Sequence, residues 1–217
     1  YRVVGYDVNA KPRQRLKSAG GCCLPSCAAV TSAVDILITS LPSVAALDDV
    51  VEKITPACAT KRKSRPRLIV IETSTLPIVD KERAMQRLRR VRATLLDCPI
   101  SGTARRMKEG AWTIFVSGGK VACKSVSAIF AVFTRNAPYV GVFGNGSRMK
   151  FIANHLVAIY NVAVGESLTF ARKMGLDPQQ VWDLFAASPV VGSGVFKLRG
   201  KFMVERKYLP ATMKVET

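Results

Sequence analysis

The chain has 217 residues, of which 48% are hydrophobic, and its formal net charge at pH 7 is +18. This length allows one large or two small globular domains, and the longest apolar runs stay below the roughly 18 residues that a membrane span needs. The positive charge favours anionic partners, such as nucleotides, carboxylated or phosphorylated substrates, and nucleic acid.

The start of the chain does not show the charged region, apolar segment and small-residue cleavage site of a secretory signal. We therefore expect the six cysteines to be reduced thiols in a cytoplasmic protein. Cys22, Cys23 and Cys27 lack a second pair of ligands and His155 is the only histidine, so no metal site is predicted. The chain begins inside a strand-like run and stops abruptly, which we interpret as a longer fold cut at both ends.

Short apolar runs alternate with helical patterns over roughly two thirds of the chain. The runs that predict strands cover 2–8, 34–41, 68–72, 94–97, 112–117 and 139–143. One helical pattern ends near residue 19, and the others cover 43–53, 80–92 and 123–133. The near-continuous apolar runs are typical of strands that are buried on both faces. The alternation predicts an α/β fold with a Rossmann-like, doubly wound parallel sheet.

Polar residues stand at the ends of three of these strands: Asp7, the segment 73–75, and 101–102. Because ligands bind at the carboxyl ends of parallel strands, these residues are expected to line a ligand site. If the first strand and its glycine loop precede Tyr1, Asp7 ends the second strand and would bind the adenosine ribose hydroxyls. Its charge would repel a 2′-phosphate, which favours NAD over NADP. The alternative is that Asp7 is only a turn residue.

A single long helix is predicted from Ser147 to Met174, with Ser147 as its N-cap and Gly175 just past its end. Its middle, 156–165, is apolar on every side, which predicts that it is buried all round. Lys150 and Asn154 fall on one stripe of this helix. They either line a cleft or serve structural roles, Asn154 by capping another element and Lys150 by extending to solvent.

The pattern changes near residue 145, because everything after it reads as helix. We therefore predict a partial dinucleotide-binding domain, 1–145, and a partial helical domain for substrate binding and dimerisation, 146–217, which starts with the helix 147–174. The full glycine pattern of a dinucleotide loop, G-x-G-x-x-G, does not occur, since Met149 takes the third position after Gly144 and Gly146.

Basic residues gather in three clusters, 61–67, 81–92 and 105–108. The first is interpreted as a solvated loop, and the second, which includes Lys81, as the outer face of a helix. Aromatic residues are not interleaved with these clusters, which weakens a role in binding single-stranded nucleic acid.

Five stretches, in the right order, resemble the β-hydroxyacid dehydrogenases, the group that includes 3-hydroxyisobutyrate dehydrogenase, tartronate semialdehyde (glyoxylate) reductase and 6-phosphogluconate dehydrogenase. They are DILITSLP (35–42), ETSTLP (72–77), DCPISGTARRMKEG (97–110), GNGSRMKFIAN (144–154) and GESLTFARKMGLDP (165–178). The resemblance covers nearly the whole chain and implies the same fold, with a first strand and glycine loop that this chain lacks.

The resemblance also implies roles for individual residues. Lys150 corresponds to the catalytic lysine of the family, and Asn154 to its partner one turn later. The implied substrate-carboxylate cradle consists of Ser101, Gly102 and Thr103, and the implied cofactor-facing loops of Leu41, Pro42, Ser74 and Thr75. Thr103 stands where the family often has a second glycine, which leaves the identity of the substrate open.

We therefore expect an oxidoreductase that transfers a hydride between a nicotinamide cofactor and a small 3-hydroxy acid or its semialdehyde, with Lys150 as general acid/base. NAD is the expected cofactor with NADP as the alternative, and a homodimer or homotetramer is expected. Two other functions stay open. One is a non-catalytic Rossmann-type module that binds nucleic acid or another polyanion, and the other is a reductase of imines or phosphorylated sugars.

Overall fold

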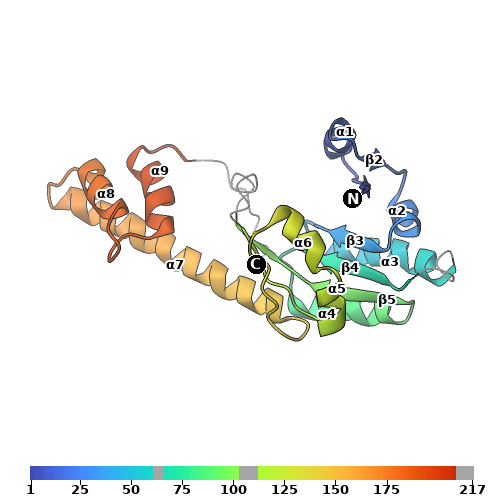
Figure 1. Ribbon diagram of the computed structural model, residues 1–217. Helices are drawn as coiled ribbons and strands as arrows, with labels where there is room; N and C mark the ends of the chain where they lie inside the picture. Colours follow the sequence, from blue (N-terminus) through green and yellow to red (C-terminus); the bar gives the residue numbers. More distant parts are fainter. Residues whose placement is uncertain (61–65, 103–111, 209–217) are drawn as a thin grey trace. The chain divides into compact units, whose positions relative to one another are not determined.

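The computed structural model describes residues 1–60, 66–102 and 112–208 (Figure 1). The chain divides into two compact units, Tyr1–Phe151 and Ile152–Thr217. The first contains all the described strands and the second only helices and turns. The domain boundary at 145/146 stays a prediction.

The described residues of the first unit form three small sheets. Two parallel sheets are formed by β1 (Val4–Gly5) with β2 (Cys22–Cys23), and by β3 (Ile36–Thr39), β4 (Leu68–Glu72) and β5 (Ala93–Asp97) in that order. An antiparallel pair is formed by β6 (Ile100–Ser101) and β7 (Thr113–Ile114). The predicted strands at 68–72 and 94–97 are confirmed, and the parallel α/β class with them.

Helices connect these strands. Those of the first unit are α1 (Ala10–Ser18), α2 (Cys27–Ala33), α3 (Val44–Thr60), α4 (Ile78–Arg89), α5 (Lys120–Ser125), α6 (Ser127–Phe133) and the start of α7 (Asn145–Lys173). Serine side chains cap the N-termini of two of these helices, α2 and α3. The hydroxyl of Ser26 accepts the Ala29 N–H at 3.1 Å, and that of Ser43 accepts the Ala46 N–H at 3.2 Å.

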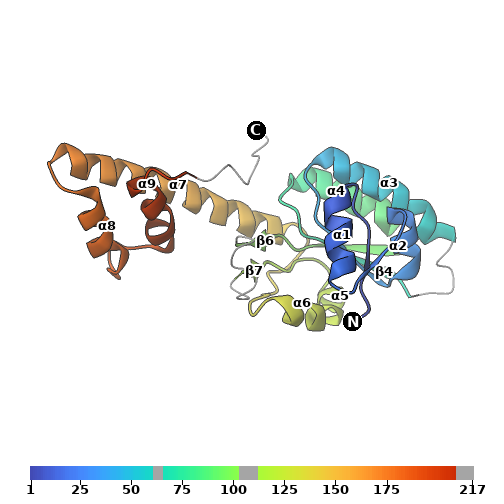
Figure 2. The same cartoon turned by 90° about the horizontal axis from the view of Figure 1, so that it is seen from above.

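Alternate side chains of β4 point into two separate cores. Leu68 and Val70 pack with buried residues of α2, α3 and α4, whereas Ile71 packs with those of α5 and α6. Figure 2 shows α3 and α4 on one side of the sheet and α5 and α6 on the other. This is the predicted parallel sheet with helices on both faces. Because helices cover both faces, the side chains on both sides of a strand are apolar, and the strand appears in the sequence as an apolar run.

One edge of this sheet differs from the prediction for 34–41. Ile38, in β3, is 46% exposed, although a strand buried on both faces was expected. Within the described residues β3 pairs only with β4, and the β1–β2 pair forms a separate sheet. The free edge of β3 therefore leaves this apolar side chain uncovered.

The predicted strand at 139–143 is wrong. Tyr139 makes only an isolated bridge to Val116, and the chain then bends at Gly141 and Gly144, which have φ values of 106° and 91°. The Nδ2 of Asn145 donates to the carbonyl oxygen of Val140 at 2.9 Å and holds this bend. Positive φ at two glycines interrupts a strand that composition alone would continue.

In the second unit, α8 (Pro178–Ala186), η2 (Phe196–Gly200) and α9 (Lys201–Val204) accompany the later turns of α7. Val164 and Leu168 of α7 form a small core with Phe196. Asp177 caps the start of α8, because its carboxylate accepts the Gln179 N–H at 3.0 Å. Gly175 follows α7 with φ of 79°, as predicted.

The middle of α7 was predicted to be buried all round, and within a single chain this is wrong. Leu156 is 44% exposed, Ile159 48% and Val162 61%. Among the described residues, no helix combines the length and apolar character that crossing a membrane requires.

Candidate active site

The carboxyl ends of β3 and β4 are joined through a buried carboxylate. Glu72 is fully buried, and its side chain accepts the Thr39 hydroxyl and the Ser74 N–H, the latter at 2.6 Å. The hydroxyl oxygen of Ser74 in turn accepts the Leu41 N–H at 2.6 Å. These bonds bring together the two loops, 41–42 and 74–75, that the sequence predicted to face a cofactor.

A second buried carboxylate, Asp97, ends β5 and accepts four hydrogen bonds. Its Oδ1 accepts the Lys81 ammonium at 2.9 Å and the Ser147 hydroxyl at 2.7 Å. Its Oδ2 accepts the Ser147 N–H at 2.8 Å and the Ser117 hydroxyl at 3.2 Å. The same Lys81 ammonium donates to the carbonyl oxygen of Ser74 at 2.6 Å. One lysine thus connects the Ser74 loop to the strand end that holds α7.

Two predictions about these residues are wrong. Lys81 was placed on the solvated face of its helix, but it is fully buried. It shares the inner stripe of α4 with Ala84 and Leu88, at i+3 and i+7, and this spacing could have revealed it. Ser147 was predicted to be an N-cap, but α7 begins before it, at Asn145, and its hydroxyl donates to Asp97.

The first turn of α7 lies directly on the end of β5. A Cβ atom at Gly146 would lie 2.5 Å from the carbonyl oxygen of Phe115, 2.6 Å from that of Asp97 and 2.9 Å from the Cδ of Pro99. The Gly146 N–H donates to the Ser117 hydroxyl at 2.9 Å. Only glycine allows this approach, so Gly146 is a packing glycine rather than part of a nucleotide loop.

Lys150 follows one turn after Gly146 and is only 7% exposed. Burial lowers the pKa of its ammonium from the ordinary value. Among the described residues, its Nζ has no hydrogen-bond partner or counter-ion. An amine on a buried side chain that makes no such bond is available for proton transfer to a bound molecule.

The predicted carboxylate cradle is reached from the same strand end. Ser101 lies in β6, paired with Thr113, and is partly buried, and Gly102 follows with φ of 147°. The chain from Pro99 to Ser101 can span at most about 7 Å, and α7 rises about 6 Å from Gly146 to Lys150. Pro99 and Gly146 lie next to each other. The segment that leads to Ser101 and the helical turn that leads to Lys150 therefore begin at neighbouring points. Thr103 lies outside the described residues.

The other predicted site residues are placed as follows. Pro42 and Thr75 are exposed, Asn154 is half-buried on α7 one turn after Lys150, and Asp7 is half-buried after β1. The Oδ1 of Asp7 accepts the Asn9 N–H at 2.7 Å, which is a turn contact. Its other carboxylate oxygen has no partner among the described residues.

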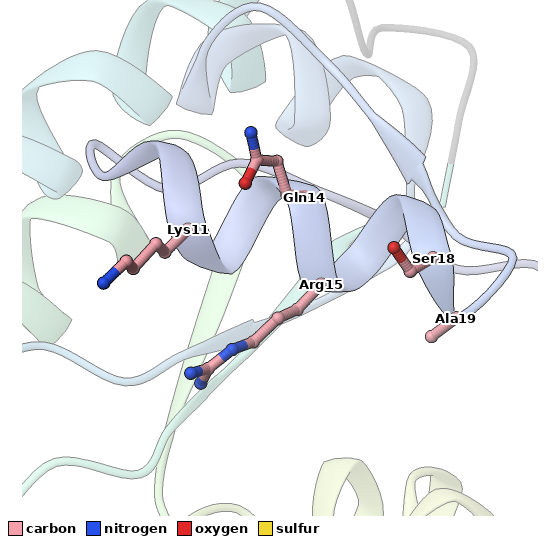
Figure 3. A pocket seen from close by; sticks show the side chains of 5 residues that line it. All are labelled: Lys11, Gln14, Arg15, Ser18 and Ala19. Carbon is pink, nitrogen blue, oxygen red and sulfur yellow. The ribbon is translucent and has the colours of Figure 1, made fainter.

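A hollow lies on the surface of α1 (Figure 3). Its lining residues are Lys11, Gln14, Arg15, Ser18 and Ala19. All five are exposed and come from a single helix and its end, so the hollow lacks the convergent buried groups of a binding site. Among the described residues, no cluster of His, Cys, Asp and Glu is placed to hold a metal ion.

Residues 1–141 match the family described as the NAD binding domain of 6-phosphogluconate dehydrogenase. Residues 144–215 match the one described as the NAD-binding domain of NADP-dependent 3-hydroxyisobutyrate dehydrogenase. The chain belongs to the β-hydroxyacid dehydrogenase family.

Within this β-hydroxyacid dehydrogenase family, 2-hydroxy-3-oxopropionate reductase from Escherichia coli (strain K12) is 29% identical over 196 residues, which are 90% of this chain and 65% of that protein. Human mitochondrial 3-hydroxyisobutyrate dehydrogenase is 27% identical over 82% of this chain and 52% of its own length. The chain thus spans between about half and two thirds of these relatives. The structure of 3-hydroxyisobutyrate dehydrogenase from Salmonella typhimurium superposes with a TM-score of 0.80 at 22% identity, covering 95% of this chain and 71% of that one.

Proposed function

We propose that this chain carries the proton-transfer site of an oxidoreductase that moves a hydride between a nicotinamide cofactor and a small 3-hydroxy acid or its semialdehyde. The observation that supports this most is Lys150, whose side chain is buried and whose amine has no partner among the described residues, on the turn of α7 that follows the end of β5 in a member of this family. A binding module for polyanions would not need such an amine. The relatives named above also favour the enzyme.

Lys150 would act at the substrate hydroxyl. In oxidation its neutral amine accepts the hydroxyl proton, and in reduction its ammonium returns a proton to the carbonyl oxygen. Burial lowers the pKa of Lys150, which makes the neutral form accessible at a lower pH. Ser101 and the backbone N–H groups after it would hold the substrate carboxylate and orient the reacting carbon. A bound nicotinamide would supply the hydride acceptor or donor.

The residues present fit a dinucleotide at two places: at its adenosine ribose, and where it would face the loops at 41–42 and 74–75. Asp7 has a carboxylate oxygen that no described residue bonds and that could accept ribose hydroxyls, and the loops at 41–42 and 74–75 are held together by the Leu41–Ser74 bond. Pro42 and Thr75 in those loops are exposed and can contact a cofactor. The chain contains no G-x-G-x-x-G loop for the pyrophosphate.

A turnover screen of the full-length protein tests the proposal. Short 3-hydroxy acids and their semialdehydes would be offered with NAD and with NADP, next to imines and phosphorylated sugars. We expect turnover of one or more hydroxy acids. Turnover of an imine or a phosphorylated sugar alone would reject the substrate class, and failure of every pair would reject the function.

We propose that NAD is preferred, because the Asp7 charge would repel the 2′-phosphate of NADP. Replacing Asp7 with asparagine keeps an acceptor for the Asn9 N–H but removes the charge. The ratio of kcat/KM with NADP to that with NAD should rise about tenfold, which corresponds to about 1.4 kcal/mol. Asp183→Asn, on an exposed part of α8, is the control and should leave this ratio unchanged. An unaltered ratio in the Asp7 variant would show that Asp7 is only a turn residue.

We also propose a homodimer or homotetramer that covers the middle of α7. The exposed apolar side chains there include Val157, Ile159, Tyr160 and Val162. Contiguous apolar surface of this kind marks protein–protein contacts. Light scattering on the full-length protein should give the mass of a dimer or tetramer, and a monomer would contradict this proposal.

A cytoplasmic location is proposed for the same protein. All six cysteines are free thiols in the structure, and Cys58, Cys98 and Cys123 are buried. Reduced thiols are typical of that compartment. Fractionation of cells that make the full-length protein would check the location.

A further inference from the structure

The buried Lys81 ammonium is shared between two parts of the candidate site. It donates to the carbonyl oxygen of Ser74, in a cofactor-facing loop, and to the carboxylate of Asp97. Asp97 accepts both the N–H and the hydroxyl of Ser147, in the first turn of α7. An unbroken chain of hydrogen bonds therefore runs from that loop through Lys81 and Asp97 to the helix that carries Lys150.

We propose that Lys81 is a positioning residue, which fixes the Ser74 loop and the start of α7 relative to each other and so sets the place of the Lys150 amine. This inference rests on the proposed function of Lys150. Lys81 does not touch the reacting atoms in this account. It acts only through Ser74 and Asp97.

Ser74, at one end of this chain of hydrogen bonds, is held by three bonds. Its carbonyl oxygen accepts Lys81, its N–H donates to Glu72 at 2.6 Å, and its hydroxyl accepts the Leu41 N–H at 2.6 Å. The loop therefore has little freedom of its own. Removing Lys81 would release the side-chain connection between this loop and the Asp97 carboxylate.

The other end determines where Lys150 lies. Ser147 precedes Lys150 by three residues, which is about 4.5 Å along the helix axis. A shift of the first turn therefore passes directly into the position of the amine. A displacement of about 1 Å at a reacting group can lower turnover by about a hundredfold.

Stability alone does not account for a pair of this kind. The side chains of Lys81 and Asp97 are both 0% exposed, so both charges have lost their hydration. Apolar residues of similar volume in place of a buried ion pair are often neutral or stabilising. What the pair provides that apolar packing cannot is directed hydrogen bonds to three separate residues, Ser74, Ser117 and Ser147.

The first test uses turnover by the full-length enzyme. In Lys81→Met, kcat should fall about a hundredfold, whereas KM and the Kd for NADH, measured by fluorescence, should change less than about threefold. Lys53→Met is the matched control, because it removes the exposed Lys53–Asp49 pair on α3 and should leave kcat unchanged. Wild-type kcat in Lys81→Met would overturn the proposal.

A double variant separates positioning from charge balance. Lys81→Met leaves the Asp97 carboxylate without its counter-ion, which can prevent folding. Adding Asp97→Asn removes that charge and should bring Tm back toward the wild-type value. A positioning role predicts that kcat stays low in the double variant. Recovery of kcat together with Tm would show a merely structural role and overturn the proposal.

The second readout does not depend on turnover. The N–H groups of Gly146 and Ser147 are bonded to side chains of the β5 end, so their hydrogen exchange reports how firmly the helix start is held. Exchange should be at least about tenfold faster in Lys81→Met, or in the double variant if the single one does not fold, and unchanged in Lys53→Met. Unchanged exchange in the Lys81 variants would overturn the proposal. If the wild-type enzyme turns over no hydroxy acid, the proposed function fails, while exchange still decides whether Lys81 holds α7.

Discussion

Replacing Lys150 with alanine is expected to lower kcat/KM for hydroxy-acid oxidation by about 10²- to 10⁴-fold, the usual contribution of a general acid or base. The side chain is buried and, among the described residues, its amine has no partner, so its removal breaks no hydrogen bond or ion pair there. The Kd for NADH, measured by fluorescence titration, should therefore stay nearly unchanged.

Lys173→Ala is the control for this variant. Lys173 is an exposed lysine in the last turn of the same helix, so the same truncation there should leave kcat/KM at the wild-type value. Full activity in Lys150→Ala would reject the role of Lys150. A joint loss of NADH affinity and activity would instead point to a structural role for this lysine.

Replacing Gly146 with alanine should lower the free energy of unfolding by about 1–3 kcal/mol or more, as overpacking does. The new Cβ would lie 2.5 and 2.6 Å from two backbone carbonyl oxygens, at Phe115 and Asp97. Backbone atoms cannot rotate away as a flexible side chain can, so the start of α7 must move. Urea denaturation followed by circular dichroism measures the change, and kcat should fall with it.

Gly165→Ala is the matched control in the interior of the same helix. Among the described residues, a Cβ at Gly165 would meet only the sulfur of Met203, at an ordinary 4.0 Å. Alanine there should therefore stabilise the protein, by about 0.5–1 kcal/mol, because it restricts the unfolded chain. If Gly146→Ala proved as stable as wild type, the close approach of α7 to β5 would be wrong.

Elements defined by local patterns could be predicted from the sequence. The buried strands at 68–72 and 94–97 follow from apolar runs, and the end of α7 follows from Gly175 just past it. The segment 139–143 could not, because the bend at Gly141 and Gly144 depends on backbone geometry rather than on apolar content. The exposure of the middle of α7 also escaped prediction, since an apolar surface does not tell which molecule covers it.

In the candidate site, too, some residues could be predicted from the sequence and others could not. Lys150 was predicted from its motif and its apolar neighbours, and the structure shows that it is buried. Lys81 was missed because it was grouped with the basic cluster at 81–92, although its spacing to Ala84 and Leu88 places it on the inner face of α4. The partners of Asp97 are far apart in sequence, so only the folded chain brings Lys81, Ser117 and Ser147 to one carboxylate.

The pH dependence of turnover in both directions tests the role of Lys150 most directly. Oxidation needs the neutral amine and reduction the ammonium, so kcat/KM should rise with pH for oxidation and fall with pH for reduction, through the same pKa. Because burial lowers the pKa of Lys150, this transition should lie below the ordinary lysine value of about 10.4. It should be absent from the residual activity of Lys150→Ala. A transition at or above that value, or one that persists in Lys150→Ala, would contradict the account.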